Sequence, residues 1–237
     1  MRKVDVCLSP DLIDSFDLTG KIVVVVDILR ATSCMVTAIA HGIKGIIPVA
    51  SVEECKTYQS QGMICAAERG GAQVEGFELG NSPFSYMSEE LKGKTIAVTT
   101  TNGTLAISKS LEAAEIIIGA FLNLSKVSSY LQSQDRDVVI HCAGWKGKVN
   151  MEDSLFAGGL VSKLSATHEM GCDAPHMVKE YYKSVKDDLF EVVKNSSHAK
   201  RLSKMGITKD IKFCVELDQY NVIPVLQENT LVKMVLN

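Results

Sequence analysis

The most marked hydrophobic pattern in the chain is a run of five β-branched residues, Ile22 to Val26. A continuous apolar run of this length is typical of a strand that is buried on both faces, as in the middle of a parallel sheet. The run ends at Asp27, and a helical pattern of apolar residues begins near Met35. The pattern therefore predicts a buried strand, a polar turn and a helix in succession.

Short apolar runs and helical patterns alternate along most of the chain. Such alternation favours a three-layer α/β/α fold with a mostly parallel, mixed central sheet and helices on both faces. Besides 22–26, the predicted strands span residues 4–8, 45–49, 63–67, 95–99, 116–118 and 137–142, with further extended segments at 211–217 and 222–225. The predicted helices span residues 33–40, 52–61, 105–114 and 123–131, with one more that opens at 150–154 and a charged helical region from 173 to 197.

Segments 21–47 and 94–117 share the order strand, polar turn, helix, strand. This similarity indicates either an internal βαβ duplication or two βαβ units that obey the same physics. A chain of 237 residues suits one large α/β domain or two small ones, and the composition changes too little along it to mark a domain boundary. We therefore expect a single domain over residues 1–237.

Polar and charged residues cluster where four of the predicted strands end. If the strands are parallel, these turns share one edge of the sheet, where ligands bind in open α/β folds. Carboxylates there can hold Mg²⁺ together with substrate phosphate oxygens, and arginines and backbone N–H groups can hold anions. Each turn also has a purely structural interpretation, as a capped helix start, a tight turn or a charge at a helix dipole. The four turns contain Asp27, Arg30 and Thr32; Glu68, Arg69, Gly70 and Gly71; Thr100 to Thr104; and Glu152 with Asp153.

The composition restricts the classes of partner. The net charge of −3 provides no global basic field that would attract nucleic acid. The seven cysteines are odd in number and none are spaced as CxxC, which argues against a disulfide framework or a zinc knuckle and for a reducing compartment. No charged-then-apolar leader opens the sequence, and no apolar run approaches the length of a membrane span. We therefore expect a cytoplasmic protein without a membrane or nucleic-acid partner.

Several motifs, taken in order, resemble the 2-phosphosulfolactate phosphatase (ComB) family over nearly the whole chain. They read VVVVDILRATSCMVTAIAHG, AAERGGAQVEGFELGNSP, TIAVTTTNGTLAI, GAFLNLSKV, HCAGW, NMEDSLFAGGL and HAKRLSKMGITKDIKFCVELD. The chain departs from the usual family pattern at Cys34, Glu78 and Ser154, without loss of a carboxylate or an arginine. The resemblance implies an α/β fold particular to the family and Mg²⁺-dependent hydrolysis of (2R)-2-phospho-3-sulfolactate to 3-sulfolactate and phosphate, a step toward coenzyme M. The alternatives are another phosphorylated hydroxy acid as substrate, or a non-catalytic anion-binding protein with the same pocket.

With this resemblance, the polar turns acquire expected roles. Asp27 is expected to bind Mg²⁺ or, as an alternative, to act as the nucleophile, and Glu68 and Asp153 are further candidates for metal ligand or base. Arg30 and Arg69 are expected to clamp anionic groups, because a planar guanidinium binds phosphate, sulfonate or carboxylate bidentately. The expected partner is a small phosphorylated, sulfonated hydroxy acid, and a homodimer is the commonest assembly for such enzymes. The residues expected around the substrate are Thr32, Gly70, Gly71, Asn81, Thr101, Asn102 and Gly103.

Other reactive side chains are interpreted structurally. His141 and Cys142 are neighbours on a predicted strand and point to opposite faces, so we expect buried packing rather than a nucleophile–base pair. His198 and Arg201 are expected in a solvated basic turn, with participation in the anion site as the alternative. Trp145 is expected to anchor a loop or join the core.

Overall fold

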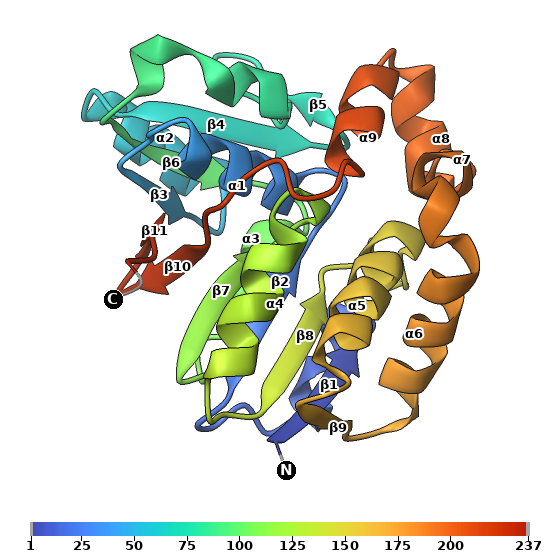
Figure 1. The fold of residues 1–237 in the computed structure, drawn as a ribbon. Coiled ribbons are helices and arrows are strands. Elements are labelled where there is room, and N and C mark those ends of the chain that lie inside the picture. Colours follow the sequence, from blue (N-terminus) through green and yellow to red (C-terminus); the bar gives the residue numbers. More distant parts are fainter. Residues whose placement is uncertain (1, 236–237) are drawn as a thin grey trace.

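The computed structural model describes residues 2–235, in which helices cover both faces of one twisted sheet (Figure 1). The strands are β1 (Arg2–Cys7), β2 (Ile22–Val26), β3 (Gly45–Pro48), β4 (Ile64–Arg69), β5 (Ala72–Gln73), β6 (Thr95–Thr99), β7 (Glu115–Gly119), β8 (Val138–Cys142), β9 (His168–Met170), β10 (Pro224–Gln227) and β11 (Thr230–Lys233). Their order across the sheet is β5-β4-β6-β3-β11-β10-β7-β2-β8-β1-β9. The predicted α/β class and the mostly parallel, mixed sheet are confirmed.

Helices connect most of the strands and also form the C-terminal part of the chain. They are α1 (Ala31–Ala40), α2 (Val52–Ser60), α3 (Gly103–Ser108), α4 (Leu124–Ser133), α5 (Met151–Leu164), α6 (Asp173–Val185), α7 (Leu189–Val193), α8 (Ser197–Lys204) and α9 (Thr208–Cys214). Short 3₁₀ helices occur at Pro10–Ser15, Pro83–Met87, Glu89–Leu91, Phe121–Asn123 and Lys186–Asp188. None of the helices formed by residues 2–235 combines the length and the apolar character needed to cross a bilayer.

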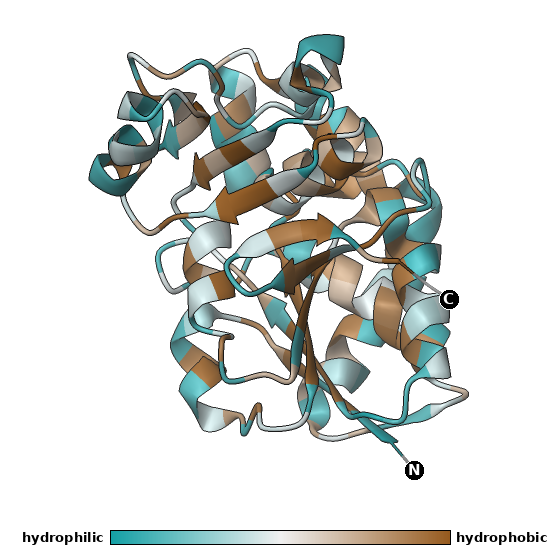
Figure 2. Ribbon diagram, turned by 90° about the vertical axis from the view of Figure 1, so that its left-hand side faces the viewer, coloured by the Kyte–Doolittle hydropathy of each residue, from teal (hydrophilic) through white to brown (hydrophobic). Residues whose placement is uncertain are grey.

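Two groups of parallel strands make up the sheet and flank a hairpin. One group is β4, β6 and β3, and the other is β7, β2, β8, β1 and β9. The β10–β11 hairpin joins the groups through antiparallel pairs on both sides, Val225 with Ile117 and Leu231 with Ile46. Strand β2 lies between β7 and β8, and all of Ile22–Val26 is buried, as the apolar run predicts. The strands are predominantly apolar where they pass through the middle of the molecule (Figure 2).

Two βαβ units cross between the two groups of strands. The unit β2–α1–β3 leads from the second group to the first, and β6–α3–β7 leads back. Strand β2 pairs with β7, and β3 pairs with β6, so each unit contributes one strand to each group. This arrangement explains the similar order of elements in segments 21–47 and 94–117, while an internal duplication stays a hypothesis.

The segment 211–217, whose alternating apolar residues predict a strand, belongs largely to helix α9, so that prediction is wrong. Its buried residues follow the spacing i, i+1, i+4 and i+5 of one helix face rather than the alternation of a strand. Ile211 and Val215 satisfy both periods, which is why a short apolar run does not distinguish them. The buried positions are Asp210, Ile211, Cys214 and Val215.

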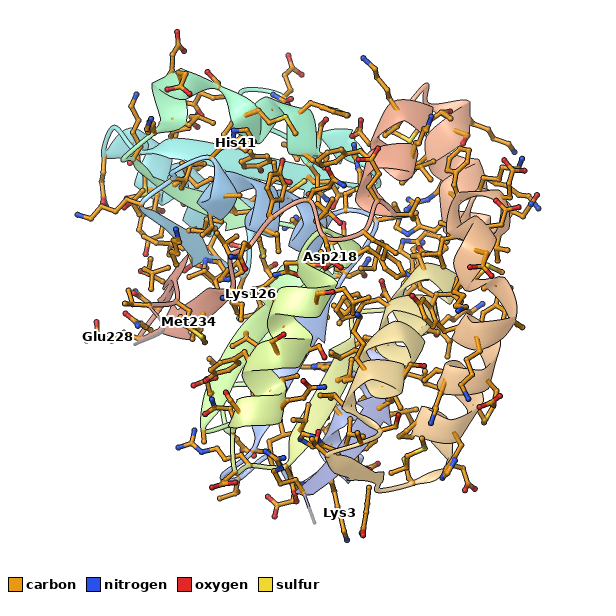
Figure 3. The ribbon with its side chains drawn as sticks, in the orientation of Figure 1. Lys3, His41, Lys126, Asp218, Glu228 and Met234 are labelled. Carbon is orange, nitrogen blue, oxygen red and sulfur yellow. The ribbon has the colours of Figure 1, made fainter. Side chains whose placement is uncertain are left out.

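The C-terminal segment returns from α9 to the sheet across α1 (Figure 1). Asp218 accepts hydrogen bonds from the backbone N–H (2.6 Å) and the hydroxyl (2.5 Å) of Ser125 at the start of α4 (Figure 3). The hydroxyl of Tyr220 lies 3.2 Å from Nε2 of His41 at the end of α1. These contacts attach the segment between α9 and β10 to helices on both groups of strands.

Candidate active site

One narrow cleft lies where the carboxyl ends of β2, β4 and β6 meet helix α8. It brings together carboxylate, guanidinium and imidazole groups from distant parts of the chain. Its volume is about 10 Å³, which is about the space of one water molecule. The residues that line it are Asp27, Leu29, Arg30, Glu68, Gly71, Asn81, Thr101, Asn102, Trp145, His198, Arg201 and Leu202.

Asp27 is placed in the cleft by the turn that joins β2 to α1. Its backbone N–H donates to the hydroxyl of Thr32 (3.0 Å), and the N–H of Thr32 donates to the carbonyl of Asp27 (2.9 Å). Thr32 is fully buried, so it closes the turn and does not line the cleft. A Cβ atom at Gly103 would lie 2.5 Å from Cβ of Ala31, at the start of α1, and 3.1 Å from Oδ2 of Asp27. Gly103 therefore leaves the space that the carboxylate occupies.

The environment of Asp27 favours the neutral form of its carboxyl group. Burial is the largest cause, and the nearby charges of Glu68 and Glu152 act in the same direction. His198 and the backbone N–H of Ala31 oppose this effect, and the resulting pKa of Asp27 is raised from 3.8 to about 6. A buried carboxyl group surrounded by other carboxylates is a feature of functional sites and of cation sites.

Glu68, near the end of β4, is held by three hydrogen-bond donors. The backbone N–H of Gly71 donates to Oε1, as does the hydroxyl of Thr101 (3.3 Å), while the N–H of Thr101 donates to Oε2 (3.2 Å). These bonds join the turn after β4 to the turn after β6. They orient the carboxylate in the cleft and engage the N–H of Gly71, a residue that was expected around the substrate.

Helix α8 packs against the Gly70–Gly71 turn. Gly71 has φ 92°, and a Cβ atom there would lie 3.1 Å from Cδ2 of Leu202 and 3.3 Å from Sδ of Met205. Both its backbone conformation and this close approach require glycine. The carbonyl of Gly70 accepts a hydrogen bond from Arg201 (3.1 Å). The glycines thus position α8 beside the carboxylates, and Gly70 lies outside the lining of the cleft.

The two predicted anion clamps, Arg30 and Arg69, are both engaged in the protein. Arg30 is buried, and its Nη1 forms an ion pair with Oδ2 of Asp210 at 2.5 Å while its Nη2 donates to the carbonyl of Gly71 at 2.8 Å. Arg69 donates to the carbonyl of Glu68 (2.6 Å) and to the hydroxyl of Thr99 (3.0 Å), and it lines a different cavity. Only Arg30 of the two therefore lines the cleft.

Asp153 connects the turns that follow β2 and β8. Its Oδ1 accepts from the N–H of Ile28 (2.9 Å), and its Oδ2 accepts from the N–H of Gly144 (3.1 Å). Burial, followed by the charges of Asp27 and Glu152, raises its pKa well above the ordinary value. Asp153 is fully buried and does not line the cleft, so these bonds describe a structural link between two strand ends.

Glu152 and His198 form a buried pair beside the carboxylates. Oε1 of Glu152 lies 2.9 Å from Nδ1 of His198, and Oε2 of Glu152 has no hydrogen-bond partner among residues 2–235. The expectation that His198 lies in a solvated basic turn is wrong, because His198 is only 6% exposed and lines the cleft. The buried positions of α8, His198, Ala199 and Leu202, have helix-face spacing, which is the sequence signal for this orientation.

The cleft offers carboxylate oxygens as ligands for Mg²⁺. Residues 2–235 contain no group of three or more His, Cys, Asp or Glu side chains arranged to hold a metal ion alone. Mg²⁺ commonly binds through only one or two carboxylates, with water and substrate phosphate as further ligands. Asp27 and Glu68 supply two carboxylates in one cleft, and their mutual repulsion is the kind of cost that a divalent cation offsets. The residues present therefore fit this cation.

The cleft combines most, but not all, of the residues selected from the sequence. It contains Asp27, Arg30, Glu68, Gly71, Asn81, Thr101 and Asn102, with Gly103 in contact with Asp27. Thr32, Arg69, Gly70 and Asp153 lie outside its lining. Glu152 belongs to a strand-end turn that the sequence indicates, and His198 and Arg201 line the cleft, which was the alternative to a solvated turn. Trp145 lines the cleft as well, and no sequence pattern indicates the part of Asp210. His141 and Cys142 are fully buried, which confirms that they belong to the packing.

Comparisons with known proteins agree with the arrangement of the motifs. A family model described as 2-phosphosulpholactate phosphatase matches residues 7–229. A protein from Thermotoga maritima is 42% identical over 223 residues, covering 94% of this chain and 95% of the relative. One from Caldanaerobacter subterraneus subsp. tengcongensis is 41% identical over 220 residues and 91% of both chains. One from Clostridium tetani is 34% identical over 224 residues, covering 93% of this chain and 96% of the relative. Each of the three is named probable 2-phosphosulfolactate phosphatase.

Proposed function

The chain belongs to the 2-phosphosulfolactate phosphatase family, and from this premise we propose that it is a Mg²⁺-dependent phosphatase of (2R)-2-phospho-3-sulfolactate. The observation that carries the proposal is the buried carboxyl group of Asp27 beside Glu68 in a cleft that also contains basic side chains. A protein that only binds anions gains nothing from two carboxylates next to a phosphate, because like charges repel. The carboxylates therefore support a metal-assisted hydrolase over an anion-binding protein.

In the proposed reaction, water attacks phosphorus, the bond between phosphorus and the C2 oxygen of the substrate breaks, and that oxygen takes up a proton. Asp27 and Glu68 would hold Mg²⁺, which when bound polarises the phosphoryl group and offsets its charge. Glu68 is also suited to orient the attacking water, since hydrogen bonds from Gly71 and Thr101 fix its carboxylate.

His198 is the side chain best suited to protonate the leaving oxygen. Its Nδ1 faces Glu152, and the hydrogen bonds among residues 2–235 leave its Nε2 without a protein partner. A carboxylate at Nδ1 orients the ring. Nε2 can therefore deliver the proton at the cleft side of the ring, and the departing product is 3-sulfolactate.

Phosphate release measures the proposed activity directly. The purified chain is treated with EDTA and assayed on phosphosulfolactate and other 2-phospho-hydroxy acids, with and without restored Mg²⁺. We expect turnover only with Mg²⁺, and a loss of about 100-fold or more in Asp27→Asn. Asp187→Asn, which changes an exposed carboxylate in the 3₁₀ helix after α6, is the matched control and should leave turnover unchanged.

Each other outcome corrects a defined part of the proposal. Absence of turnover on every compound contradicts the enzyme assignment, and preference for another compound corrects the substrate. Near-normal turnover by Asp27→Asn removes Asp27 from the mechanism. An aspartyl-phosphate on Asp27 would give retention of configuration at a chirally labelled phosphorus, whereas direct attack by water gives inversion.

The proposal extends to the pathway that the family resemblance implies. If the product 3-sulfolactate is a precursor of coenzyme M, cells that lack this chain should contain less of both compounds. Unchanged coenzyme M in such cells would contradict the pathway while leaving the enzymatic activity intact.

A further inference from the structure

We propose that Arg201 recognises the sulfonate group of the substrate, and so distinguishes phosphosulfolactate from phospho-hydroxy acids that lack a sulfonate. This inference rests on the proposed function and adds a specificity-determining residue to it. Arg201 lies within α8 and lines the same cleft as Asp27 and Glu68. It follows Asp27 by 174 positions and Glu68 by 133 positions in the chain.

The guanidinium of Arg201 lies at the exposed side of the cleft in a defined orientation. One of its nitrogens donates to the carbonyl of Gly70 at 3.1 Å, and its Cζ lies 4.6 Å from the centre of the Trp145 ring. Stacking on the indole stabilises the planar cation, and one hydrogen bond leaves most of its five N–H donors free. The side chain is therefore held in one orientation, and most of its N–H donors can still bind a ligand.

Helix α8, which carries Arg201, packs against the rest of the site. Leu202 and Met205 pack directly on Gly71. The N–H of Gly71 donates to Glu68, which supplies a carboxylate to the same cleft. The cleft itself has a volume of only about 10 Å³. A ligand that reaches Asp27 must therefore contact or displace the side chains of α8 that line the cleft, including Arg201.

Among residues 2–235, Arg201 is the cationic side chain of the cleft that has no carboxylate partner. Arg30 is paired with Asp210 at 2.5 Å, and His198 is paired with Glu152 at 2.9 Å. Arg201 thus carries the positive charge of the cleft that no carboxylate in the described part of the chain balances. A second anionic group that enters the cleft beside the phosphate is attracted to this charge.

The chemistry of the substrate assigns this charge to the sulfonate. Phosphate and carboxylate share one carbon atom, so both lie at the reacting end, next to Asp27 and Glu68. The sulfonate is on the neighbouring carbon, and the two protein carboxylates repel it. A planar guanidinium can bind two oxygens of an oxyanion in parallel, which a point charge does not do. Arg201 is therefore suited to bind the sulfonate in the cleft.

The test compares two substrates that differ only in the sulfonate, phosphosulfolactate and 2-phospholactate. In Arg201→Gln, kcat/KM for phosphosulfolactate should fall by about 10- to 100-fold, mainly through KM, and that for phospholactate by less than about twofold. Arg201→Lys should recover part of the loss, because it keeps the charge and loses the fork. Lys200→Gln, an exposed neighbour on α8, is the matched control and should leave both substrates unaffected.

Equal losses on both substrates overturn the inference, because Arg201 would then bind a group that the two share, and the absence of any loss overturns it as well. Calorimetric binding of 3-sulfolactate and of lactate separates this failure from a failure of the proposed function. If the wild type binds 3-sulfolactate and Arg201→Gln weakens that binding about tenfold or more, the inference is supported even without turnover. If the wild type does not bind 3-sulfolactate, or both proteins bind it equally, the inference is wrong.

Discussion

Removing the carboxylate of Asp210 should destabilise the protein strongly, although Asp210 lies on a short C-terminal helix. The side chains of Asp210 and Arg30 are only 10% and 5% exposed, and their ion pair measures 2.5 Å. In Asp210→Ala, the carbonyl of Gly71 is the one partner that residues 2–235 leave to the buried guanidinium. Breaking a buried pair by removing one partner costs about 3–5 kcal/mol, because the remaining charge stays buried without compensation. This is a large fraction of the ~5–15 kcal/mol by which folded proteins are stable.

Urea unfolding followed by circular dichroism measures this loss as a lower midpoint at an unchanged slope. The control is Glu180→Ala, which breaks the exposed ion pair between Glu180 and Lys183. Because solvent screens exposed pairs, we expect the midpoint of this variant to match that of the wild type. The difference between the two variants therefore isolates the effect of burial.

A double variant distinguishes an uncompensated charge from a general loss of packing. In Arg30→Met with Asp210→Leu, both charges are replaced by apolar side chains of related size. Replacing a buried pair in this way is often neutral or stabilising, so the double variant should unfold near the wild-type midpoint. A buried charge without a partner does not explain the loss if Asp210→Ala unfolds like Glu180→Ala, or if the double variant is less stable than Asp210→Ala.

Two further predictions concern the site and the core. Gly103→Ala should lower kcat by about 100-fold, since the added methyl would lie 2.5 Å from Cβ of Ala31 and 3.1 Å from Oδ2 of Asp27 and would shift the turn that places the carboxylate; small misplacements of catalytic groups have effects of this order. Near-normal kcat would show that the site tolerates the shift. Burial lowers the pKa of His141 from 6.5 to about 4. Between these pH values the unfolded chain binds more protons than the folded one, so stability should fall by about 3 kcal/mol as the pH drops. His141→Gln should remove that part of the pH dependence in urea midpoints, and parallel profiles for the two proteins would contradict it.

The carboxylate side of the cleft could be predicted because it depends on local patterns. The apolar run Ile22–Val26 specifies a strand that is buried on both faces, and the structure places β2 between β7 and β8. A charged residue at the end of such a strand must lie near its neighbours' ends in a parallel sheet. Asp27 and Glu68 follow from this argument, and they do line one cleft.

The roles of individual polar groups could not be predicted in the same way. A carboxylate beside a strand end can line a cleft, as Asp27 does, or accept two backbone N–H bonds, as Asp153 does. The sequence around both residues is similar in character, and only the tertiary position of the turns decides between the two outcomes. Arg69 is a comparable case, since it follows Glu68 directly and points into another cavity.

The positions of the basic residues in the cleft depend on contacts between distant parts of the chain, which no local sequence pattern indicates. Arg30 and Asp210 are separated by 180 positions in the chain, and each resembles a surface charge when considered alone. Their buried pairing fixes α9, while the packing of Leu202 on Gly71 fixes α8, so that Arg201 lies beside carboxylates from the strand ends. The two sides of the site thus have different origins: the sheet supplies the carboxylates, and the C-terminal helices supply the unpaired cation. Substitution of Arg201 is therefore expected to change which anion is bound, whereas substitutions of the carboxylates in the strand-end turns are expected to change whether the reaction occurs.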